Sequence, residues 1–344
     1  AKNSMSYQFS KYETHYRNLT YLGVPIIIGQ LGNLILNFAD TLMIGHHSTK
    51  ELAAAAFVNN MFTLVIIFAI GFTYAITALV GILYGQDKTH RIGEIMKSAT
   101  AANTCMAILL SAIMIVLYLN IHRLGQPEEL LPLIRPYFLI QLVSLPFVCW
   151  FNTFRQFTDG ITDTKVAMWI LVAGNVMNIF GNWILIYGHL GLPEMGLVGA
   201  GLSTMISRIV MAVVMVGIFF FSKKYREYKK GWSMGSVQYT DFKKITVLGI
   251  PLALQMGMET AAFSLSSLMV GWFGTESLAA HQVMLTISQL GYMIYYGLAA
   301  AVAVRISNFM GQRDYLAVRR TATAGIHLVF LLAILTSVPI FICR

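Results

Sequence analysis

The stretch LGIPLALQMGMETAAFSLSSLMVGW, residues 248–272, is long enough to cross a lipid bilayer and carries a single charged side chain, Glu259. A membrane-spanning helix needs about 20 predominantly apolar residues. A carboxylate near the middle of such a helix costs roughly 2.5–3.5 kcal/mol on insertion scales. Residues 22–46, LGVPIIIGQLGNLILNFADTLMIGH, have the same character and also carry one acid, Asp40. Each stretch therefore predicts a membrane helix that retains one costly carboxyl group.

The composition of the whole chain predicts an all-α polytopic membrane protein. Hydrophobic residues make up 57% of the chain and charged residues 11%, whereas soluble domains contain about 25% charged residues. Nine apolar segments approach or exceed the length that a tilted helix needs to span a bilayer: residues 20–45, 53–84, 98–119, 133–154, 166–188, 197–221, 245–273, 278–310 and 321–343. The net charge of +9 could indicate a nucleic-acid partner, but we attribute it to basic loops between the helices and expect no such partner.

Lysine and arginine gather in alternate connections between these segments, which is the pattern of cytoplasmic loops. The pattern predicts a multi-pass protein of a bacterial-type inner (plasma) membrane with its N-terminus in the cytoplasm. The longest connection, residues 222–244, is also strongly basic and predicts a cytoplasmic linker between two lobes. His46 and His47 fall in a short connection on the opposite side, where we expect a solvated pair and no metal site.

An internal repeat supports this boundary. A shift of 226 residues aligns the two halves without a gap, and it pairs Gly23 with Gly249, Pro25 with Pro251, Gly71 with Gly297 and Gly85 with Gly311. Six predicted helices separate the two copies, so the repeats run in the same direction, as in one class of transporters. We therefore expect an N-lobe at residues 1–221, the linker at 222–244 and a partial C-lobe at 245–344. A repeated six-helix unit gives twelve helices, and we expect the last three to be absent from this chain.

Polar residues follow one face of several predicted helices, as the helical period requires for a shared stripe. They predict a polar cavity between the lobes, lined by Gln30, Asn33, Asn37, Gln255, Gln282, Gln289 and Tyr296. Ordinary hydrogen bonding between helices is the competing interpretation for each single amide. Asp40 and Glu259 are the only acids that we place within spans, and ionisable groups at that depth are seldom kept for packing. Pro25 and Pro251 are expected to permit helix bending.

Several motifs in order along the chain carry a family resemblance. They are Pro25 with Asp40 in NFADTLMIG, the run NIFGNWILIYG from Asn178, the run GAGLSTMISR from Gly199, Pro251 with Glu259 in GIPLALQMGMET, and AAHQV from Ala279. Together the motifs resemble the multidrug and toxic compound extrusion (MATE) family of cation-coupled exporters, over nearly the whole chain. The resemblance implies two lobes of parallel six-helix repeats that form a V around a drug-sized chamber.

The resemblance also implies roles for individual residues. Asp40 matches the N-lobe acid that exchanges a proton or ion against substrate, and Asn178 and Thr204 match its hydrogen-bonding companions. Asn182 falls where part of the family has an aspartate, which resembles the NorM-like branch and puts purely N-lobe proton coupling in doubt. Glu259 matches the C-lobe acid associated with cation coupling in that branch, and is a candidate Na+ ligand.

The function expected from the resemblance is antiport by alternating access. Na+ or H+ would neutralise Glu259, Asp40 or both, and amphipathic, often cationic drugs would leave in exchange. We expect a monomer in contact with membrane lipids and no cofactor beyond the coupling ion. A lipid-linked oligosaccharide flippase is an alternative that is disfavoured because Arg208 is almost the only basic residue that we place within a span. An intramembrane enzyme is also disfavoured, since no nucleophile motif or histidine-rich cluster is present.

Overall fold

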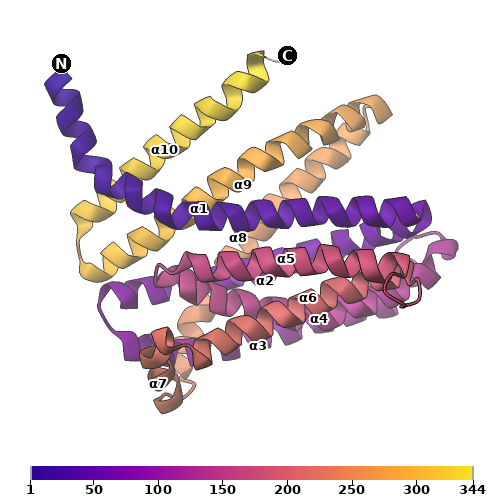
Figure 1. Ribbon diagram of the computed structural model, residues 1–344, viewed down its shortest axis with the longest axis horizontal. Coiled ribbons are helices and arrows are strands. Elements are labelled where there is room, and N and C mark those ends of the chain that lie inside the picture. The colour runs from indigo at the N-terminus through magenta and orange to yellow at the C-terminus, as the bar shows by residue number, and fades with distance from the viewer. Residues whose placement is uncertain (1, 343–344) are drawn as a thin grey trace.

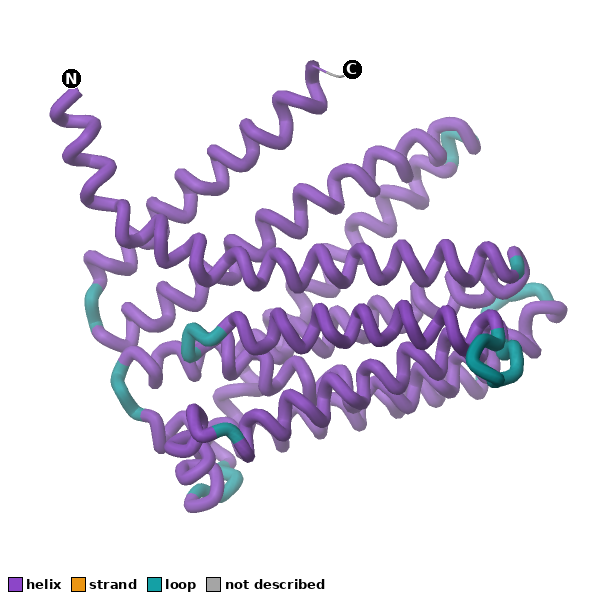
Figure 2. The backbone as a smooth tube through the Cα atoms, in the orientation of Figure 1, coloured by secondary structure: helices purple, strands orange, loops and turns teal. Residues whose placement is uncertain are grey.

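The computed structural model describes the backbone of residues 2–342, which is almost entirely helical (Figure 2). Ten α-helices follow one another with short connections in this part of the chain. Their bounds are α1 (Lys2–His47), α2 (Thr49–Gly85), α3 (Thr89–Leu119), α4 (Leu131–Gly160), α5 (Thr164–Tyr187), α6 (Gly196–Phe221), α7 (Arg226–Met234), α8 (Tyr239–Gly271), α9 (Thr275–Gln312) and α10 (Tyr315–Ile342).

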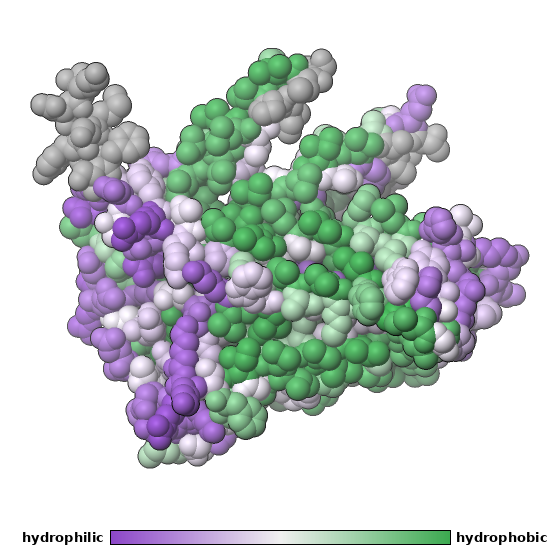
Figure 3. Space-filling view, viewed as in Figure 1, coloured by the Kyte–Doolittle hydropathy of each residue, from purple (hydrophilic) through white to green (hydrophobic). Residues whose placement is uncertain are grey.

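Among the described residues, nine helices are long and apolar enough to cross a membrane, and they coincide with the nine predicted segments. Helices satisfy their own backbone hydrogen bonds, which is what lipid demands of a spanning segment. The surface agrees with this interpretation, because hydrophobic residues form a band between two hydrophilic ends (Figure 3). The predicted all-α membrane fold is therefore confirmed.

The basic linker contains structure that the charge pattern did not predict. Within residues 222–244, α7 lies against α3 so closely that a Cβ atom at Gly93 would stand 2.0 Å from the Tyr228 carbonyl oxygen. Lys97 Nζ donates to the Gly235 carbonyl oxygen at 2.9 Å, and the Tyr228 ring packs edge-on against Phe157 at 5.2 Å. The linker is thus a folded cap on one end of the bundle. We call this end the α7 end, and the opposite end, where α1 terminates, the His47 end.

Helices α1 to α6 pack side by side, whereas α8, α9 and α10 fan away from them (Figure 1). The fan is closest to α1 and α2 toward the α7 end and diverges from them toward the His47 end. The N-terminal part of α1 packs on both α9 and α10, in a buried cluster made of Leu19, Leu22, Ile26, Leu298, Ala301, Val304 and Ala324. Because α1 contacts both groups of helices, the lobe boundary drawn from the sequence stays a prediction.

The closest approach between the two groups occurs where α2 passes α9. A Cβ atom at Gly85 would lie 1.9 Å from the Asn308 carbonyl oxygen, and one at Gly311 would lie 2.0 Å from the Ile82 carbonyl oxygen. The 226-residue shift converts Gly85 into Gly311 and Ile82 into Asn308. These two contacts are therefore the same contact made once from each repeat.

Other contacts obey the same relation. A Cβ atom at Gly71 would lie 2.8 Å from the Ala253 Cα atom, and one at Gly297 would lie 3.0 Å from the Ile27 backbone nitrogen. The 226-residue shift converts Gly71 into Gly297 and Ile27 into Ala253, so these two contacts are also equivalent. Gly81 faces Ser307, its own counterpart, so an approximate twofold axis passes between them. The repeat inferred from glycine spacing is thus expressed as a symmetric crossing of α2 and α9.

Both prolines lie inside continuous helices, Pro25 in α1 and Pro251 in α8. A proline removes one intrahelical hydrogen bond and is a common cause of bending. Helix α1 changes direction along its length (Figure 1), and a contribution of Pro25 to this bend stays a prediction.

The crossing predicts a clear effect of adding one methyl group. Gly85→Ala and Gly311→Ala should each destabilise the protein by about 1–3 kcal/mol, because the new Cβ atom overlaps a backbone carbonyl that can move only with its helix. Thermal unfolding of the detergent-solubilised protein measures the change. Gly217→Ala is the matched control, since nothing lies within 4 Å of its added Cβ, and it should melt at the wild-type temperature or higher because alanine favours helix. Equal melting temperatures for all three variants would contradict the crossing.

Candidate functional site

Asp40 is partly buried on α1, two turns before that helix ends. Asn182 on α5 is fully buried, and its Nδ2 donates to Asp40 Oδ1 at 2.5 Å. The other oxygen of this amide, Asn182 Oδ1, is buried and has no hydrogen-bond partner. The pair therefore joins an acid to an amide that still has one free acceptor, a condition that is uncommon for buried polar atoms.

Asn178 lies one turn from Asn182 on the same helix and is also buried. Its Nδ2 donates to Thr204 Oγ1 on α6 at 3.3 Å, and Ser203 Oγ donates to its carbonyl oxygen at 2.8 Å. The structure thus brings the predicted supporting residues together, with Asn178 and Asn182 on neighbouring turns of α5 and Thr204 beside them on α6. Asn182 is the one that contacts Asp40, while Asn178 and Thr204 form a second pair beside it.

Arg208, one turn beyond Thr204 on α6, is held by neutral oxygens of α4. Its Nη1 donates to Gln141 Oε1 at 2.7 Å and to Ser144 Oγ at 2.8 Å. Within the described part of the chain, no ion pair includes Arg208. The guanidinium of Arg208 is therefore not paired directly with a carboxylate among the described residues.

Glu259 is exposed on α8. Tyr292 on α9 donates its hydroxyl proton to Glu259 Oε1 at 3.0 Å, and its ring stacks on Tyr296 at 6.0 Å. The described residues contain no cluster of three or more histidine, cysteine or acidic side chains arranged to hold a metal. Ligation of Na+ by Glu259 stays a prediction, and Tyr292 is the partner that the structure adds.

A cavity of about 270 Å³ lies where α1, α2, α4, α8 and α9 meet. Gln30 and Tyr296 line it, as predicted. The other lining residues are Ile26, Tyr74, Thr77, Ala78, Arg155, Gln156, Asp159, Leu252, Ala300, Ala303 and Val304. The cavity walls therefore come from both groups of helices.

The remaining predicted cavity residues do not line this pocket, and their place in a substrate cavity stays a prediction. Asn33 Oδ1 instead accepts from Asn175 Nδ2 at 3.4 Å, which is ordinary bonding between helices. The others are exposed side chains outside the lining of this pocket: Asn37, Gln255, Gln282 and Gln289.

Sequence reasoning missed Arg155 and Asp159. Helix α4 continues to Gly160, six residues beyond the predicted end at 154, and both side chains are buried at 9% and 6% exposure. The expectations that Asp40 and Glu259 are the only acids within spans, and that Arg208 is nearly the only base, are therefore wrong. The signal was present in FNTFRQFTDG, where Phe151, Phe154 and Phe157 keep helical spacing through the charged residues.

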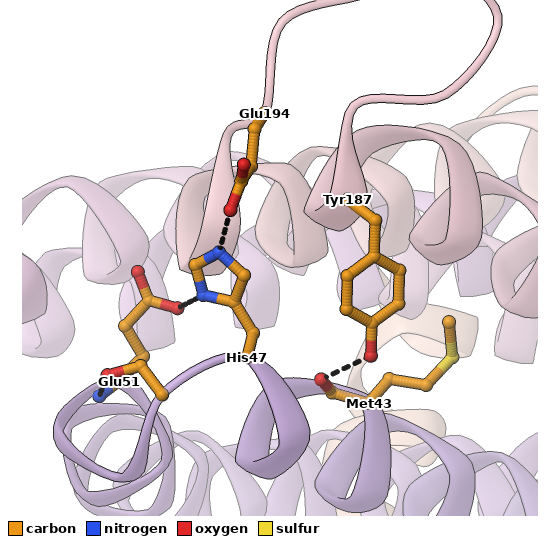
Figure 4. A network of polar contacts seen from close by, with 6 residues as sticks. Met43, His47, Glu51, Tyr187 and Glu194 are labelled. Atoms are coloured by element: carbon orange, nitrogen blue, oxygen red, sulfur yellow. Dashed lines mark hydrogen bonds and ion pairs between the residues drawn. The ribbon is translucent and has the colours of Figure 1, made fainter.

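The two histidines at the end of α1 do not form a solvated pair. His47 Nδ1 lies 2.6 Å from Glu51 Oε2 on α2, and its Nε2 lies 2.6 Å from Glu194 Oε1 in the connection before α6 (Figure 4). Carboxylates accept hydrogen bonds only, so both ring nitrogens must carry protons in this arrangement. Beside it, the Tyr187 hydroxyl donates to the Met43 carbonyl oxygen at 2.8 Å. Together these contacts tie α1, α2 and α5 at the His47 end.

Comparison with known proteins identifies the family. A family model described as MatE matches residues 25–184 and again 251–344, and the two matches begin 226 residues apart. A protein named "Probable multidrug resistance protein NorM" from Photorhabdus laumondii is 30% identical over 329 residues, covering 94% of this chain and 71% of that protein. The chain belongs to the MATE family. MATE proteins are transporters, so an intramembrane enzyme is excluded.

Solved structures agree on the fold. The crystal structure of a MATE protein in complex with MaL6 superposes with a TM-score of 0.82 at 21% identity, covering 93% of this chain and 70% of that one. A MOP superfamily transporter from Pyrococcus furiosus superposes with a TM-score of 0.81 at 20% identity, with the same coverage of both chains. At these identities the likeness shows the shared MATE architecture.

The His47 contacts predict a structural role at the His47 end of this MATE protein. His47→Gln should lower stability by about 2 kcal/mol, because Glu51, which is 14% exposed, loses a charge-assisted hydrogen bond. The melting temperature in detergent measures this loss. Lys50→Gln is the matched control, since the Lys50–Glu129 pair is 70% and 80% exposed and surface pairs contribute little. If the two variants have the same melting temperature, the His47 contacts do not stabilise the packing of these helices.

Proposed function

We propose that this MATE protein is an antiporter that exports amphipathic, often cationic organic compounds in exchange for Na+ or H+. The observation that carries the proposal is the Asp40–Asn182 pair, an acid within a spanning helix bonded to a buried amide that keeps a free acceptor. The related protein named as a probable multidrug resistance protein supports the substrate class.

The coupling step follows from the charge of Asp40. An ionised carboxylate within a span is costly, and a proton or Na+ removes that charge. Protonation also turns one carboxyl oxygen into a donor, for which Asn182 Oδ1 is the unused acceptor after rotation of its amide. A ligand biases two conformations only through different affinity for them. Cation occupancy and drug occupancy at Asp40 therefore exclude each other and drive the exchange.

Glu259 supplies the second proposed coupling group. It lies on the opposite group of helices, and the Tyr292 hydroxyl oxygen is close enough to share a cation with its carboxylate. Oxygen donors of this kind suit a hard cation. Sodium at Glu259 and a proton at Asp40 are two separate ways to neutralise the transporter, one in each group of helices.

The shape supports alternating access. The two groups of helices are in contact toward the α7 end and diverge toward the His47 end. Tyrosine and methionine side chains along α8 and α9 offer an adaptable apolar surface, which suits binding of varied drugs. If the N-terminus lies in the cytoplasm, as the basic residues predict, the divergence toward the His47 end supports an outward-facing state, which we propose for a monomer in a bacterial-type inner membrane.

The export function has a direct test. In cells that express the full-length protein, Asp40→Asn should abolish export of the fluorescent cation ethidium, because an amide cannot bind and release the coupling cation. Glu259→Gln should lower export and change its dependence on Na+ at fixed pH. Lys229→Gln, an exposed control on α7 outside the spans, should export normally. If both acid variants export normally with unchanged cation dependence, the coupling proposal is wrong.

The orientation has a separate test. With the native cysteines replaced, Lys229→Cys on α7 should react with a membrane-impermeant maleimide only in inside-out vesicles, and Lys50→Cys at the His47 end only in right-side-out cells. Both positions are exposed, so protection reports the side of the membrane. The reverse pattern would place the N-terminus outside.

A further inference from the structure

The cavity between the two groups of helices contains an incomplete ion pair. Arg155 and Asp159 lie one turn apart on α4, with 3.8 Å between Arg155 Nε and Asp159 Oδ2. Other ion pairs of this protein are tighter, such as Lys230–Glu227 at 2.7 Å and Arg91–Glu94 at 2.8 Å. Arg155 Nε and Asp159 Oδ1 are buried and have no hydrogen-bond partner. One donor and one acceptor, both on charged groups, are therefore unused.

Neighbouring polar groups do not complete the pair. Thr77 donates its hydroxyl proton to the side chain and carbonyl oxygens of Gln156 at 2.5 and 3.3 Å. The side-chain amide of Asn308 satisfies its surroundings when its nitrogen faces the carbonyl oxygens of Gly81 and Gly160. In that orientation the nitrogen donates to both. Buried charges that lack their full set of hydrogen bonds are destabilising. The site is therefore satisfied best by polar groups that come from outside the chain.

The rest of the cavity wall is apolar or aromatic. Tyr74 on α2 and Tyr296 on α9 meet edge to face at 6.4 Å, and Ile26, Leu252 and several alanines complete the wall. Tyrosine rings favour contact with other rings as well as with aliphatic groups. A volume of about 270 Å³ holds one ring with a short polar substituent. The cavity thus combines a paired positive and negative group with an apolar chamber.

We propose that this cavity binds compact zwitterions, with a carboxylate on Arg155, an ammonium group on Asp159 and an apolar body packed against Tyr74 and Tyr296. The proposal rests on the proposed export function and adds a substrate class to it. A zwitterion satisfies both unused groups and leaves the cavity neutral. A simple cation leaves a net positive charge in a region of low dielectric, where an unpaired charge is costly.

The charges and the facing ring belong to different groups of helices, since Arg155 and Asp159 lie on α4 and Tyr296 lies on α9. A bound zwitterion therefore bridges both groups close to the crossing of α2 and α9. This location is separate from Asp40, whose hydrogen-bond partner is on α5.

Three probes with one body test the proposal: phenylalanine, a zwitterion; phenylalanine methyl ester, a cation; and N-acetylphenylalanine, an anion. Equilibrium binding to the purified full chain in detergent is measured by isothermal titration calorimetry. Phenylalanine should bind about tenfold or more tightly than either relative, since one lost charge-assisted contact corresponds to at least that factor.

Two variants should each remove one part of the preference for phenylalanine. Arg155→Gln should remove the advantage of phenylalanine over its methyl ester, and Asp159→Asn should remove its advantage over N-acetylphenylalanine. The neutral double variant Arg155→Gln/Asp159→Asn, checked by its melting temperature, should bind all three probes alike even if a single variant folds poorly. Lys230→Gln, which removes an exposed pair outside the cavity, is the control and should keep the wild-type ranking.

Binding of all three probes with equal affinity, no binding of any probe, or a ranking that the variants leave unchanged would overturn the proposal. These outcomes are independent of the coupling proposal, because the measurement uses no ion gradient and leaves Asp40 and Glu259 intact.

Discussion

The close crossing of α2 and α9 is the constraint on which the rest of this molecule depends. Backbone carbonyls of one helix lie where a side chain of the other would begin, at Gly85 and again at Gly311. Only glycine permits this approach, and the repeat supplies it at equivalent positions in both halves. The crossing fixes where the two groups of helices meet, and it leaves them free to diverge toward the opposite end. A symmetric pivot of this kind suits a rocking transporter.

The functional side chains do not share the symmetry of the pivot. Under the 226-residue shift, Glu259 corresponds to Asn33, which bonds Asn175, while Asp40 corresponds to Ser266, which bonds its own helix. Each acid is therefore aligned by the shift with a neutral residue of the other repeat. Arg155 and Asp159 add a third charged location near the crossing itself. A symmetric frame with asymmetric charges lets the two groups of helices respond differently to one coupling ion.

Much of the frame could be predicted from the sequence because lipid imposes strong rules. Spanning segments must be long, apolar and helical, so all nine were located, and glycine spacing revealed the repeat. Partners across the repeat could not be predicted, because a pattern shows that Gly71 needs space but not that Ala253 fills it. Helix α7 was missed because its charges outweighed Tyr228 and Trp232, which pack on the bundle together with Tyr225 just before the helix.

The site was predicted less completely for similar reasons. Asp40 was identified because an acid within a span is costly and seldom incidental, and Asn182 was identified through the family resemblance. Arg155 and Asp159 were assigned to a loop, since hydropathy falls at the end of α4 although the helix continues. Gln255, Gln282 and Gln289 share a polar face with the acids, but a face alone does not tell which neighbour it meets. Cavities arise from helix divergence, which no local pattern encodes.

One measurement tests the central claim, that the two groups of helices rock about this crossing. Spin labels at Lys88 and Asp314, which follow α2 and α9, report the α7 end, and labels at Lys50 and Glu276 report the His47 end. Double electron–electron resonance in lipid, recorded with and without the coupling cation and ethidium, gives both distances. The account predicts that one distance lengthens as the other shortens. Two distances that change in the same direction, or that stay fixed in a protein that still exports ethidium, would contradict it.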